Sequence, residues 1–343
     1  MSDAECPVFD ATGSAAAASS DDKGVTRRDW LRTTAAGGAL SFLTPALINP
    51  VEARAMPSQS ASSSFRFCFN TSTIRGQNLT LEEEIEIAGH VGYTGIEPWI
   101  SEVEKAVERG VSLKELKHRL SDAGLKVESA IGFAQWIVDD ETQRKKGLDE
   151  LHKDMDLVRE LGGTYIAAPP AGMQDQNAPT LNLLAAADRY RAALELGEKT
   201  GVIPMMEVWG FSKNVSHLGE ATMIAIESRH PKACVLTDVY HLHKGGSDAR
   251  SLRMLNGASL PVMHFNDYPG GKSLTELSDA DRVYPGDGIA PLTEIVRILR
   301  EIGFNGALSL ELFNRDYWKD DARTVAKTGF DKMKAAVDKG LKG

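Results

Sequence analysis

Short apolar runs alternate with longer amphipathic stretches along most of this 343-residue chain. This alternation is typical of repeated strand–helix units, which build a parallel sheet with helices packed against it. Eight of the apolar runs have strand length, and eight is the number of strands that closes a (β/α)₈ barrel. The predicted strands are residues 65–69, 95–97, 126–131, 164–168, 203–207, 235–238, 262–265 and 307–311. The sequence therefore predicts an α/β protein with a single (β/α)₈ barrel.

The amphipathic stretches predict the helices of this barrel. They cover residues 80–90, 113–123, 142–161, 181–199, 217–228, 248–255, 292–302 and 321–339. Glycines, which commonly end helices, follow five of them, at Gly92, Gly124, Gly162, Gly201 and Gly303. A doubly wound open sheet is the alternative, but it needs a glycine-rich phosphate turn after its first strand. Residues 69–72 contain no glycine, so we set this alternative aside.

The N-terminal residues have the order of an export signal. Arg27 and Arg28 precede a mildly apolar stretch, residues 35–48, and then the small-x-small triplet Ala53-Arg54-Ala55. This order favours a cleaved twin-arginine signal over residues 1–55 rather than an ordinary amphipathic helix. The apolar stretch is shorter than the roughly 20 residues that a membrane-spanning helix needs, so we expect no stable membrane anchor after cleavage.

Cleavage would leave 343 − 55 = 288 residues, which is a common length for one barrel. Residues 56–64 are rich in serine and lack an apolar period, so we expect a linker there. The barrel is then expected over residues 65–343. An exported barrel would act in the periplasm or another space outside the cytoplasm.

The net charge of −9 comes without any run of lysine and arginine. Nucleic acids and anionic membranes attract basic surfaces, so neither is an expected partner. Small molecules remain, and the sequence leaves open whether two copies pair into a homo-oligomer through their outer helices. Cys68 and Cys234 lie in separate apolar runs, where cysteines are commonly buried small hydrophobes, so we expect no disulfide.

Ionisable residues stand at the ends of five predicted strands. They are Glu97, Glu207, Asp238, His264 and Glu311. Barrel active sites lie at the C-terminal ends of the strands, where buried charges are costly unless they are paired or bound to a metal. The last four form an oxygen-rich set that suits one divalent cation, Mn²⁺ in first place, with Mg²⁺ and Co²⁺ as alternatives. About two coordination positions would remain for neighbouring oxygens of a sugar, whose adjacent C–H the cation would acidify.

Short motifs surround these residues. They are Met206-Glu207-Val208, Asp238-Val239-Tyr240-His241, His264-Phe265-Asn266-Asp267, Leu310-Glu311 and Arg282-Val283-Tyr284-Pro285-Gly286-Asp287-Gly288. Together they resemble the xylose isomerase-like barrel superfamily, and within it the sugar isomerase/epimerase branch. The resemblance covers the chain from Phe65 to the last predicted helix. This branch contains ketose 3-epimerases, hydroxypyruvate isomerases and inosose dehydratases.

The resemblance implies specific roles for the residues at the strand ends. Glu207 and Glu311 would both bind the metal and act as the two acid/base groups on opposite faces of the substrate. Asp238 and His264 would be metal ligands only. His241 would hydrogen-bond a substrate hydroxyl or carbonyl.

Two departures from the family pattern concern the substrate pocket. The family's arginine, here Arg282, would hold a substrate oxygen near the metal, but it usually follows its histidine closely. In this chain residues 268–281 intervene. The epimerases also commonly have a second glutamate six residues after the first, and here that position is Lys213. Both departures leave the metal set intact and leave the substrate open.

Three further residues have expected roles near the site. Glu97 has no matching motif, so it is expected either to contact the substrate or to pair with an arginine or another site residue. Trp209 lies just beyond the fifth strand and is expected to form part of the pocket wall, although aromatic side chains also pack beneath loops. Asp267 is expected to orient a neighbouring ligand rather than bind the metal.

These residues predict a metal-dependent isomerase or epimerase that transfers a proton next to the carbonyl of a small sugar or keto-polyol. An inosose-type dehydratase, a lyase in which water then leaves, is the alternative on the same fold. A non-catalytic exported sugar-binding barrel is the alternative of a different class, because a fold alone does not guarantee a function. A barrel nuclease is not expected, since it would need more strand-end histidines and a basic face.

Overall fold

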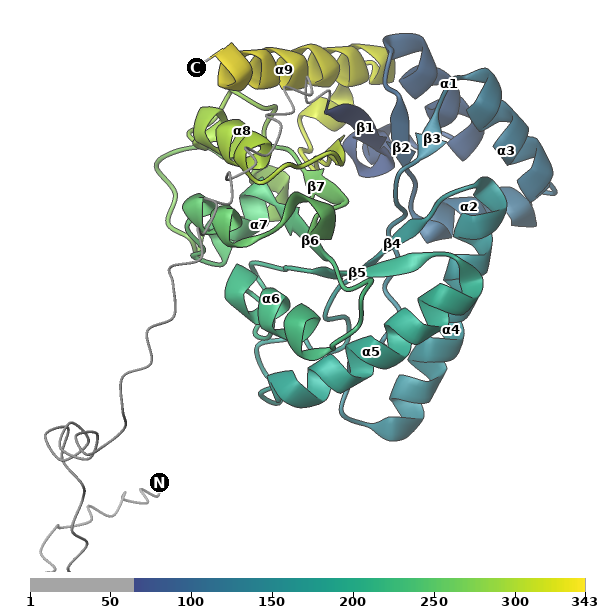
Figure 1. The fold of residues 1–343 in the computed structure, drawn as a ribbon. Helices are drawn as coiled ribbons and strands as arrows, with labels where there is room; N and C mark the ends of the chain where they lie inside the picture. The colour runs from purple at the N-terminus through teal and green to yellow at the C-terminus, as the bar shows by residue number, and fades with distance from the viewer. Residues whose placement is uncertain (1–64, 343) are drawn as a thin grey trace, which may run out of the picture. The chain divides into compact units, whose positions relative to one another are not determined.

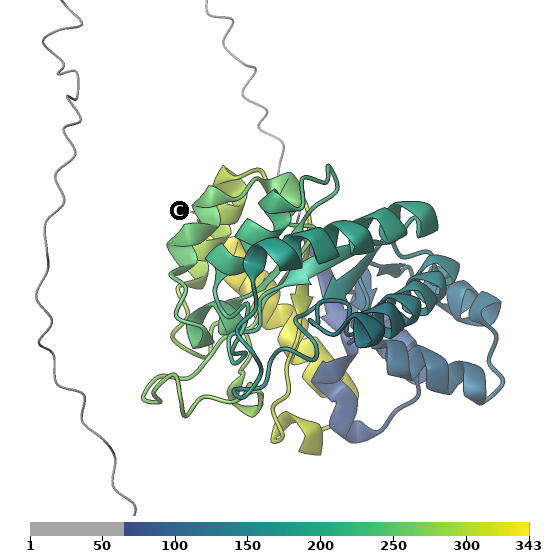
Figure 2. The ribbon, with the colours of Figure 1, turned by 90° about the horizontal axis from the view of Figure 1, so that it is seen from below.

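The computed structural model describes residues 65–342, in which helices surround eight strands (Figures 1 and 2). The strands are β1 (Arg66–Asn70), β2 (Gly95–Glu97), β3 (Lys126–Val127), β4 (Tyr165–Ala168), β5 (Ile203–Glu207), β6 (Val235–Asp238), β7 (Val262–His264) and β8 (Ala307–Leu310). The predicted export signal and linker lie outside the described residues.

Nine α-helices occur within these described residues. They are α1 (Leu81–Val91), α2 (Ile100–Glu108), α3 (Leu113–Asp122), α4 (Glu141–Leu161), α5 (Leu183–Thr200), α6 (Leu218–Glu227), α7 (Val239–Lys244), α8 (Leu292–Glu301) and α9 (Ala322–Lys342). Short 3₁₀ helices are η1 (Thr71–Gln77), η2 (Ala249–Met254), η3 (Gly257–Ser259), η4 (Asp279–Asp281) and η5 (Tyr317–Lys319).

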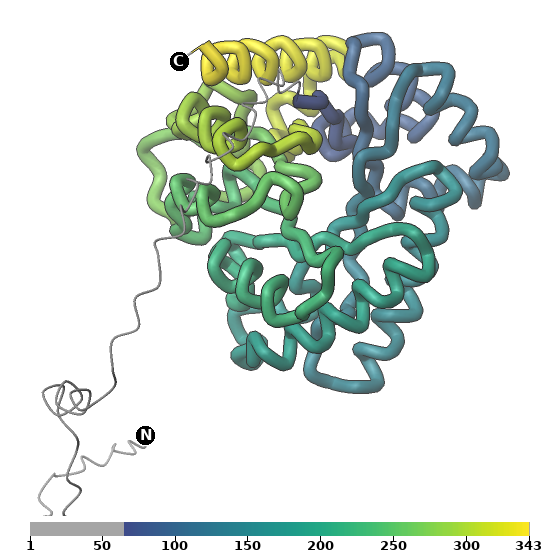
Figure 3. The backbone as a smooth tube through the Cα atoms, viewed as in Figure 1, coloured from purple at the N-terminus to yellow at the C-terminus, as the bar shows by residue number. Residues whose placement is uncertain are grey.

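All paired strands run parallel, in the order β3-β2-β1-β8-β7-β6-β5-β4. Pairing of β1 with β8 joins the first strand to the last. Between the two remaining edges, the N–H of Ala167 in β4 donates a hydrogen bond to the C=O of Ala130 after β3, at 2.9 Å. The backbone thus follows the closed course of a (β/α)₈ barrel (Figure 3). Among the described residues, the junction between β3 and β4 has the least backbone hydrogen bonding. The predicted fold is confirmed.

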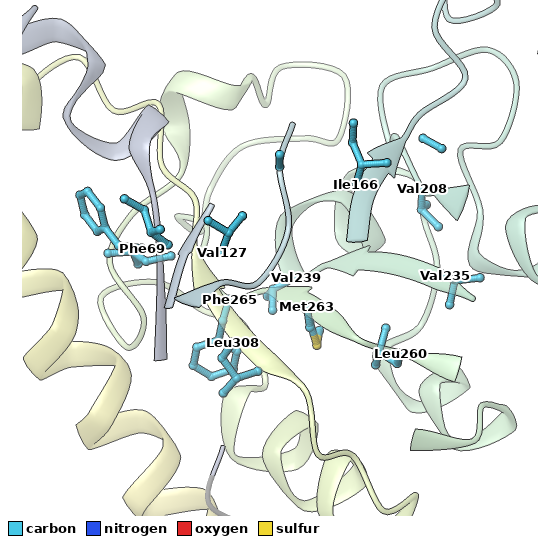
Figure 4. Packing of buried hydrophobic residues seen from close by; sticks show 14 of the residues in the cluster. Phe69, Val127, Ile166, Val208, Val235, Val239, Leu260, Met263, Phe265 and Leu308 are labelled. Atoms are coloured by element: carbon cyan, nitrogen blue, oxygen red, sulfur yellow. The ribbon is translucent and has the colours of Figure 1, made fainter. Parts of the chain in front are cut away.

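Side chains along each strand alternate between two faces, as the pleat of a strand requires. Met263 and Leu308 belong to the large cluster packed between strands and helices (Figure 4). Their neighbours Val262 and Ala307 belong to a second, smaller cluster made by the opposite face of the strands. The same period of two places His264 on this inner face, so residues at the strand ends point toward the barrel axis.

Local sequence explains where the helices begin and end. Helix α1 begins with a capping box, in which Thr80 Oγ1 accepts from the N–H of Glu83 at 3.3 Å and Glu83 accepts from the N–H of Thr80 at 2.8 Å. The five glycines predicted to end helices all have positive φ, from 69° at Gly124 to 107° at Gly92. Residues with a side chain rarely adopt this conformation, so the predicted helix–strand turns are confirmed.

Some elements differ from the prediction. Two helices, α2 and α3, lie between β2 and β3 where one was expected, because Gly110 with φ of 92° separates them. The short helix α7 directly after β6 was not expected either. Residues 248–255 form the 3₁₀ helix η2 rather than an α-helix. The predicted strand 126–131 is paired as a strand only over Lys126–Val127, while Ile131 forms an isolated bridge with Trp99.

Both cysteines of the described residues are free and buried, Cys68 in β1 and Cys234 just before β6. Burial raises the pKa of both thiols, that of Cys234 to about 12, so neither is a thiolate near neutral pH. Among residues 65–342, no helix has the length and apolar character needed to cross a bilayer.

Candidate active site

Three side chains from consecutive strand ends converge on the inner face of the barrel. Asp238 ends β6, His264 ends β7 directly opposite it, and Glu311 follows β8. The Nδ1 atom of His264 lies 3.4 Å from Oδ2 of Asp238 and 3.1 Å from Oε2 of Glu311. All three residues are buried, and one donor atom from each lies within 4.8 Å of the others. The structure thus brings together three of the four residues that the sequence indicates as metal ligands.

Glu97, at the end of β2, contacts the other edge of the His264 ring. Its Oε2 atom lies 3.0 Å from Nε2 of His264 and also accepts hydrogen bonds from Asn70 at 2.9 Å and Ser309 at 2.7 Å. Burial opposes ionisation of Glu97, but His264 and the two donors hold its pKa below the ordinary value. A carboxylate at Nε2 keeps that nitrogen as a donor, so Nδ1 faces the other site carboxylates.

Glu207, at the end of β5, is 4% exposed, and its buried Oε2 atom has no hydrogen-bond partner among the described residues. Burial raises its pKa to about 8, while His264 opposes this rise and Glu311 adds to it. Glu207 is not part of the three-residue cluster, but it lines the same cavity as Glu311. A carboxyl with a pKa near neutrality in a cavity is suited to proton transfer.

Arg282 forms a buried clamp over the cluster. Its Nη1 atom donates to Oδ2 of Asp238 at 2.6 Å and to Oε2 of Glu311 at 2.8 Å. Its Nη2 atom contacts Nε2 of His241 at 3.0 Å and Oδ1 of Asp279 at 2.8 Å. Burial would raise the pKa of Asp238, but Arg282 and then His241 hold it well below its usual range. Asp238 is therefore a carboxylate across the physiological pH range.

His241, in α7, is a neutral ring at physiological pH. Burial and then the charge of Arg282 lower its pKa to about 4. Because the guanidinium donates to Nε2, the ring proton belongs on Nδ1. That buried Nδ1 atom has no partner in the described part of the chain, and His241 lines the cavity. The ring can therefore donate a hydrogen bond to an oxygen placed beside it.

Asp267 holds the loop that follows Arg282 rather than a member of the cluster. Its side chain accepts hydrogen bonds from the backbone N–H groups of Gly286 at 2.9 Å, Gly288 at 3.1 Å and Ala290 at 2.8 Å. A Cβ atom at Gly288 would lie 2.3 Å from Oδ1 of Asp267, so only glycine fits so close to the carboxylate. The expectation that Asp267 orients a neighbouring ligand is replaced by this role in the loop.

A cavity of about 200 Å³ opens beside these groups, and aromatic side chains form much of its wall. Trp209 stacks on Phe211 with ring centroids 5.2 Å apart. The ring centroid of Phe133 lies 5.0 Å from that of Trp99 and 5.9 Å from that of Trp209. Phe313 completes the aromatic part of the lining. Trp209 therefore lies in the wall where the sequence placed it, and flat aromatic faces can pack against the C–H faces of a sugar.

Residues 85–336 match the family described as xylose isomerase-like TIM barrel. This chain belongs to that family. The match covers most of the described residues and includes Glu97, Glu207, Asp238, His264 and Glu311. The predicted resemblance is confirmed at the level of the family.

The relatives of this barrel are isomerases, epimerases and dehydratases. An inosose isomerase from Bacillus velezensis is 27% identical over 280 residues, which are 80% of this chain and 98% of that protein. A 3-dehydroshikimate dehydratase from Pseudomonas putida is 24% identical over 251 residues, 73% of this chain and 39% of that protein. A crystal structure of the IolI protein with a bound zinc atom has a TM-score of 0.73 at 24% identity, covering 80% of this chain and 99% of that one.

The cluster fits the divalent cation that this family implies. Nδ1 of His264 lies near two carboxylate oxygens yet makes no hydrogen bond among the described residues. Burial lowers the pKa of His264, but the charges of Glu311 and Glu97 raise it well above its ordinary value, so the ring carries a second proton without a metal. A bound cation would take the place of the proton on Nδ1, while Nε2 would still donate to Glu97. Two carboxylates and one imidazole are common donors to Mn²⁺ and Zn²⁺. Asp238, His264 and Glu311 are thus residues that can hold such an ion.

Sequence reasoning missed several neutral residues that this xylose isomerase-like barrel uses around the cluster. Asn266 donates to both carboxylate oxygens of Asp238, at 3.2 and 3.1 Å, and Asn70 and Ser309 contact Glu97. Asn70 ends β1, so the strand-end rule that found the acids applied to it as well. Lys213, at the position of the epimerases' second glutamate, donates instead to the backbone of Ala178 and is absent from the cavity lining.

Proposed function

We propose that this chain is a metal-dependent isomerase or epimerase that transfers a proton at the carbon next to the carbonyl of a small sugar or keto-polyol. The observation that carries the proposal is the combination found in one cavity. A cluster fit for a cation stands beside Glu207, a carboxyl whose Oε2 atom is buried without a partner. Inosose isomerase among the relatives supports the same reaction class.

The two glutamates are the proposed acid/base pair. Glu207 would remove the proton as a carboxylate, because its Oε2 atom is buried at the cavity without a hydrogen-bond partner among the described residues. Glu311 would act from the other side of the substrate, held in place by Arg282 at 2.8 Å. An epimerase needs both groups, while an isomerase can return the proton with one.

We propose Mn²⁺ as the resident ion, with Asp238, His264 and Glu311 as ligands and Glu207 as the fourth. A divalent cation bound there would polarise the substrate carbonyl and make the neighbouring C–H more acidic. The zinc atom bound to the IolI structure supports a divalent cation and leaves open its identity here.

Other cavity residues would orient the substrate. The neutral ring of His241 would donate from Nδ1 to a hydroxyl or carbonyl oxygen, and Arg282 would hold an oxygen near the cluster. Trp209 would pack against the sugar. We propose that Glu97 is a positioning residue for His264, because its carboxylate is fully buried against that ring and lies outside the cavity lining.

The test of this function uses turnover in D₂O. Ketoses and inososes are supplied with Mn²⁺, and deuterium should enter the carbon next to the carbonyl. Glu207→Gln should lower kcat by about 100-fold or more at saturating Mn²⁺, because it removes the base and keeps the shape. Saturation compensates for the weaker metal binding expected of an amide at a ligand position. The matched control is Glu195→Gln, an exposed residue of α5. A Glu207→Gln variant with full exchange would show that Glu207 is not the base. An unmodified protein that binds these ligands without any exchange would favour the non-catalytic binding barrel.

A dehydratase is the second candidate, because 3-dehydroshikimate dehydratase is among the relatives. The same proton would be removed, and a β-hydroxyl would then leave as water. Mass spectrometry decides between the two reactions. A product of unchanged mass in H₂O supports the isomerase, whereas a product lighter by one water supports the lyase.

We also propose that residues 1–55 direct export by the twin-arginine route, which would place the barrel outside the cytoplasm. The order of paired arginines, apolar stretch and cleavage triplet supports this proposal. Replacing Arg27 and Arg28 with lysine should retain the uncleaved protein in the cytoplasmic fraction. Equal amounts of processed protein with and without the replacements would contradict it.

A further inference from the structure

A second hollow of about 590 Å³ lies beside the cavity of the active site. Its lining residues belong to α2 and α4, which contact each other, and to the segment that follows β3. Ile131 and Phe133 line both this groove and the 200 Å³ cavity. These two side chains therefore form a boundary that the two hollows share.

Asp154, on α4, forms a buried polar part of the groove lining. Asp154 is 5% exposed, and its side chain makes no hydrogen bond or ion pair within residues 65–342. Burial raises its pKa to about 7, with Glu150 adding to the effect. The carboxyl lines the groove, so its oxygens can accept hydrogen bonds from hydroxyl groups of a molecule bound there.

Gly132 keeps the space in front of this carboxyl open. A Cβ atom at Gly132 would lie 3.0 Å from Oδ2 of Asp154, so a larger residue would crowd the carboxyl. Lys146, Lys153 and Glu104 also line the groove and offer both donors and acceptors. Asp149 and Glu150 line it too, so four carboxyl groups and two ammonium groups surround the space and offer acceptors and donors to the hydroxyl groups of a sugar ring.

Phe133 stands where the groove and the cavity meet. Its side chain is 40% exposed although it packs against Trp99 and Trp209. An exposed aromatic face where the aromatic-walled cavity meets the polar groove can support the C–H face of a sugar at the junction of two rings.

We propose that this groove binds a second sugar unit, so that the substrate is a disaccharide or other glycoside whose reacting unit occupies the cavity. Asp154 accepts from hydroxyl groups of the outer unit, and Phe133 supports the linkage. This inference rests on the proposed function for its reacting unit, and it adds the class of substrate that the barrel selects.

Binding is measured in the Glu207→Gln background with Mg²⁺, so that turnover does not consume the ligand. The probes are D-fructose and three ketose disaccharides, namely isomaltulose, leucrose and turanose, in which glucose is joined to different hydroxyls of fructose. Calorimetry gives the Kd values, and saturation-transfer NMR reports contact with each ring. At least one disaccharide should bind at least about 10-fold more tightly than fructose, corresponding to about 1.4 kcal/mol.

Two substitutions test the groove by different means. Asp154→Asn removes the charge of the acceptor, and Ser101→Trp fills the groove from an exposed position on α2. Each should reduce the advantage of the disaccharide over fructose by at least about 5-fold and weaken the NMR signals of the outer ring. The matched controls are Asp156→Asn on α4 and Ser121→Trp at an exposed position of α3, and both should retain the full advantage.

Equal affinity for fructose and all three disaccharides overturns the proposal. So does a loss that is the same for both kinds of ligand in the Asp154→Asn and Ser101→Trp variants. Deuterium exchange by the unmodified protein separates this failure from that of the proposed function. Exchange of fructose without disaccharide selectivity removes only the groove, whereas selective binding without any exchange keeps the groove and removes the reaction.

Discussion

At the scale of single residues, the Oε2 atom of Glu97 orients the ring of His264, a proposed metal ligand. Asn70, Ser309 and His264 all approach its Oε2 atom, within 2.7 to 3.0 Å. In Glu97→Gln an amide NH₂ group at this position would face donors, and an amide oxygen there would be a weaker acceptor. His264 should then be held less firmly. We expect the affinity for Mn²⁺, measured by calorimetry or electron paramagnetic resonance, to fall by about 10- to 100-fold.

The matched control for this change is Glu128→Gln. Glu128 is also buried, but it pairs with Arg66 at 2.7 Å instead of contacting the cluster. Its substitution should leave the Kd for Mn²⁺ within about 2-fold of the parent. Similar Kd values for the parent and Glu97→Gln would show that the carboxylate at Nε2 does not position the ring.

A second residue-scale prediction concerns Glu84, on α1, which is 3% exposed and whose Oε2 atom has no partner in the described chain. Burial raises its pKa to about 9, Glu102 adds to the rise, and Arg75 opposes it. The folded state thus keeps a proton that an unfolded glutamate, with a pKa of about 4.3, releases. This contribution to stability is complete below that lower pKa and declines as pH rises, until the folded carboxyl ionises near pH 9.

Glu84→Gln cannot ionise, so its free energy of unfolding should decline less between pH 6 and pH 9 than that of the parent. Urea unfolding at several pH values measures the difference. The comparison of slopes is independent of any constant effect of the substitution. Parallel profiles would mean that Glu84 already ionises in the folded state near neutral pH.

The charged residues of the site were predictable because strand order and a period of two place strand ends on one inner face. Asp238, His264 and Glu311 follow from that rule. Asn70 and Ser309 share the same face, but a neutral amide or hydroxyl is cheap to bury when it is hydrogen-bonded, so its residue type did not mark it as part of the site. The hydrogen-bond partner of each buried acid depends on how neighbouring strands are aligned in the barrel, and a single sequence does not give that alignment.

At the scale of elements, the loop after Arg282 depends on a single carboxylate. Asp267 accepts from the N–H groups of Gly286, Gly288 and Ala290, and hydrogen bonds to a charged group contribute about 1.5–3 kcal/mol each. Asp267→Asn removes the charge and one acceptor. We expect a loss of about 2 kcal/mol in the free energy of unfolding and faster hydrogen exchange at these three amides.

Asp287→Asn is the control for this loop, because Asp287 is exposed and pairs only with Lys332 among the described residues. It should change neither the free energy of unfolding nor the exchange of the loop amides by a measurable amount. Unchanged exchange in Asp267→Asn would show that backbone contacts alone hold the loop.

Most elements could be predicted, because apolar periods and helix-ending glycines give independent signals that agree. The exceptions have local causes. A βα unit needs only one helix, so the prediction of 113–123 accounted for α3 and missed α2, which lies before Gly110. Helix α7 has six residues, which is too short for a helical period to register, and η2 has a tighter winding that propensity does not distinguish from an α-helix.

At the scale of the whole molecule, the count of strands predicted the barrel, but the sequence could not predict how evenly it closes. The junction of β1 with β8 has four paired residues, whereas the junction of β3 with β4 has the single hydrogen bond between Ala167 and Ala130. The run 126–131 contains enough apolar residues for a longer strand. After Val127 the N–H of Glu128 still donates to Ile96 of β2 at 3.1 Å, and the next bridge is from Ile131 to Trp99, beside the cavity.

This uneven closure predicts where the barrel opens first. Ala167 and Phe265 are both buried and both donate one backbone hydrogen bond across a junction, at 2.9 Å to Ala130 and at 2.7 Å to Ser309. Opening at Ala167 breaks one bond, whereas opening at Phe265 must disturb the paired strands β7 and β8. Local openings occur first in the elements with the fewest cooperative contacts.

The amide of Ala167 should therefore exchange with solvent deuterium at least about 10-fold faster than that of Phe265, a difference of about 1.4 kcal/mol in opening free energy. Native-state exchange followed by NMR measures both amides in one sample, and equal protection would mean that the barrel opens only as a whole.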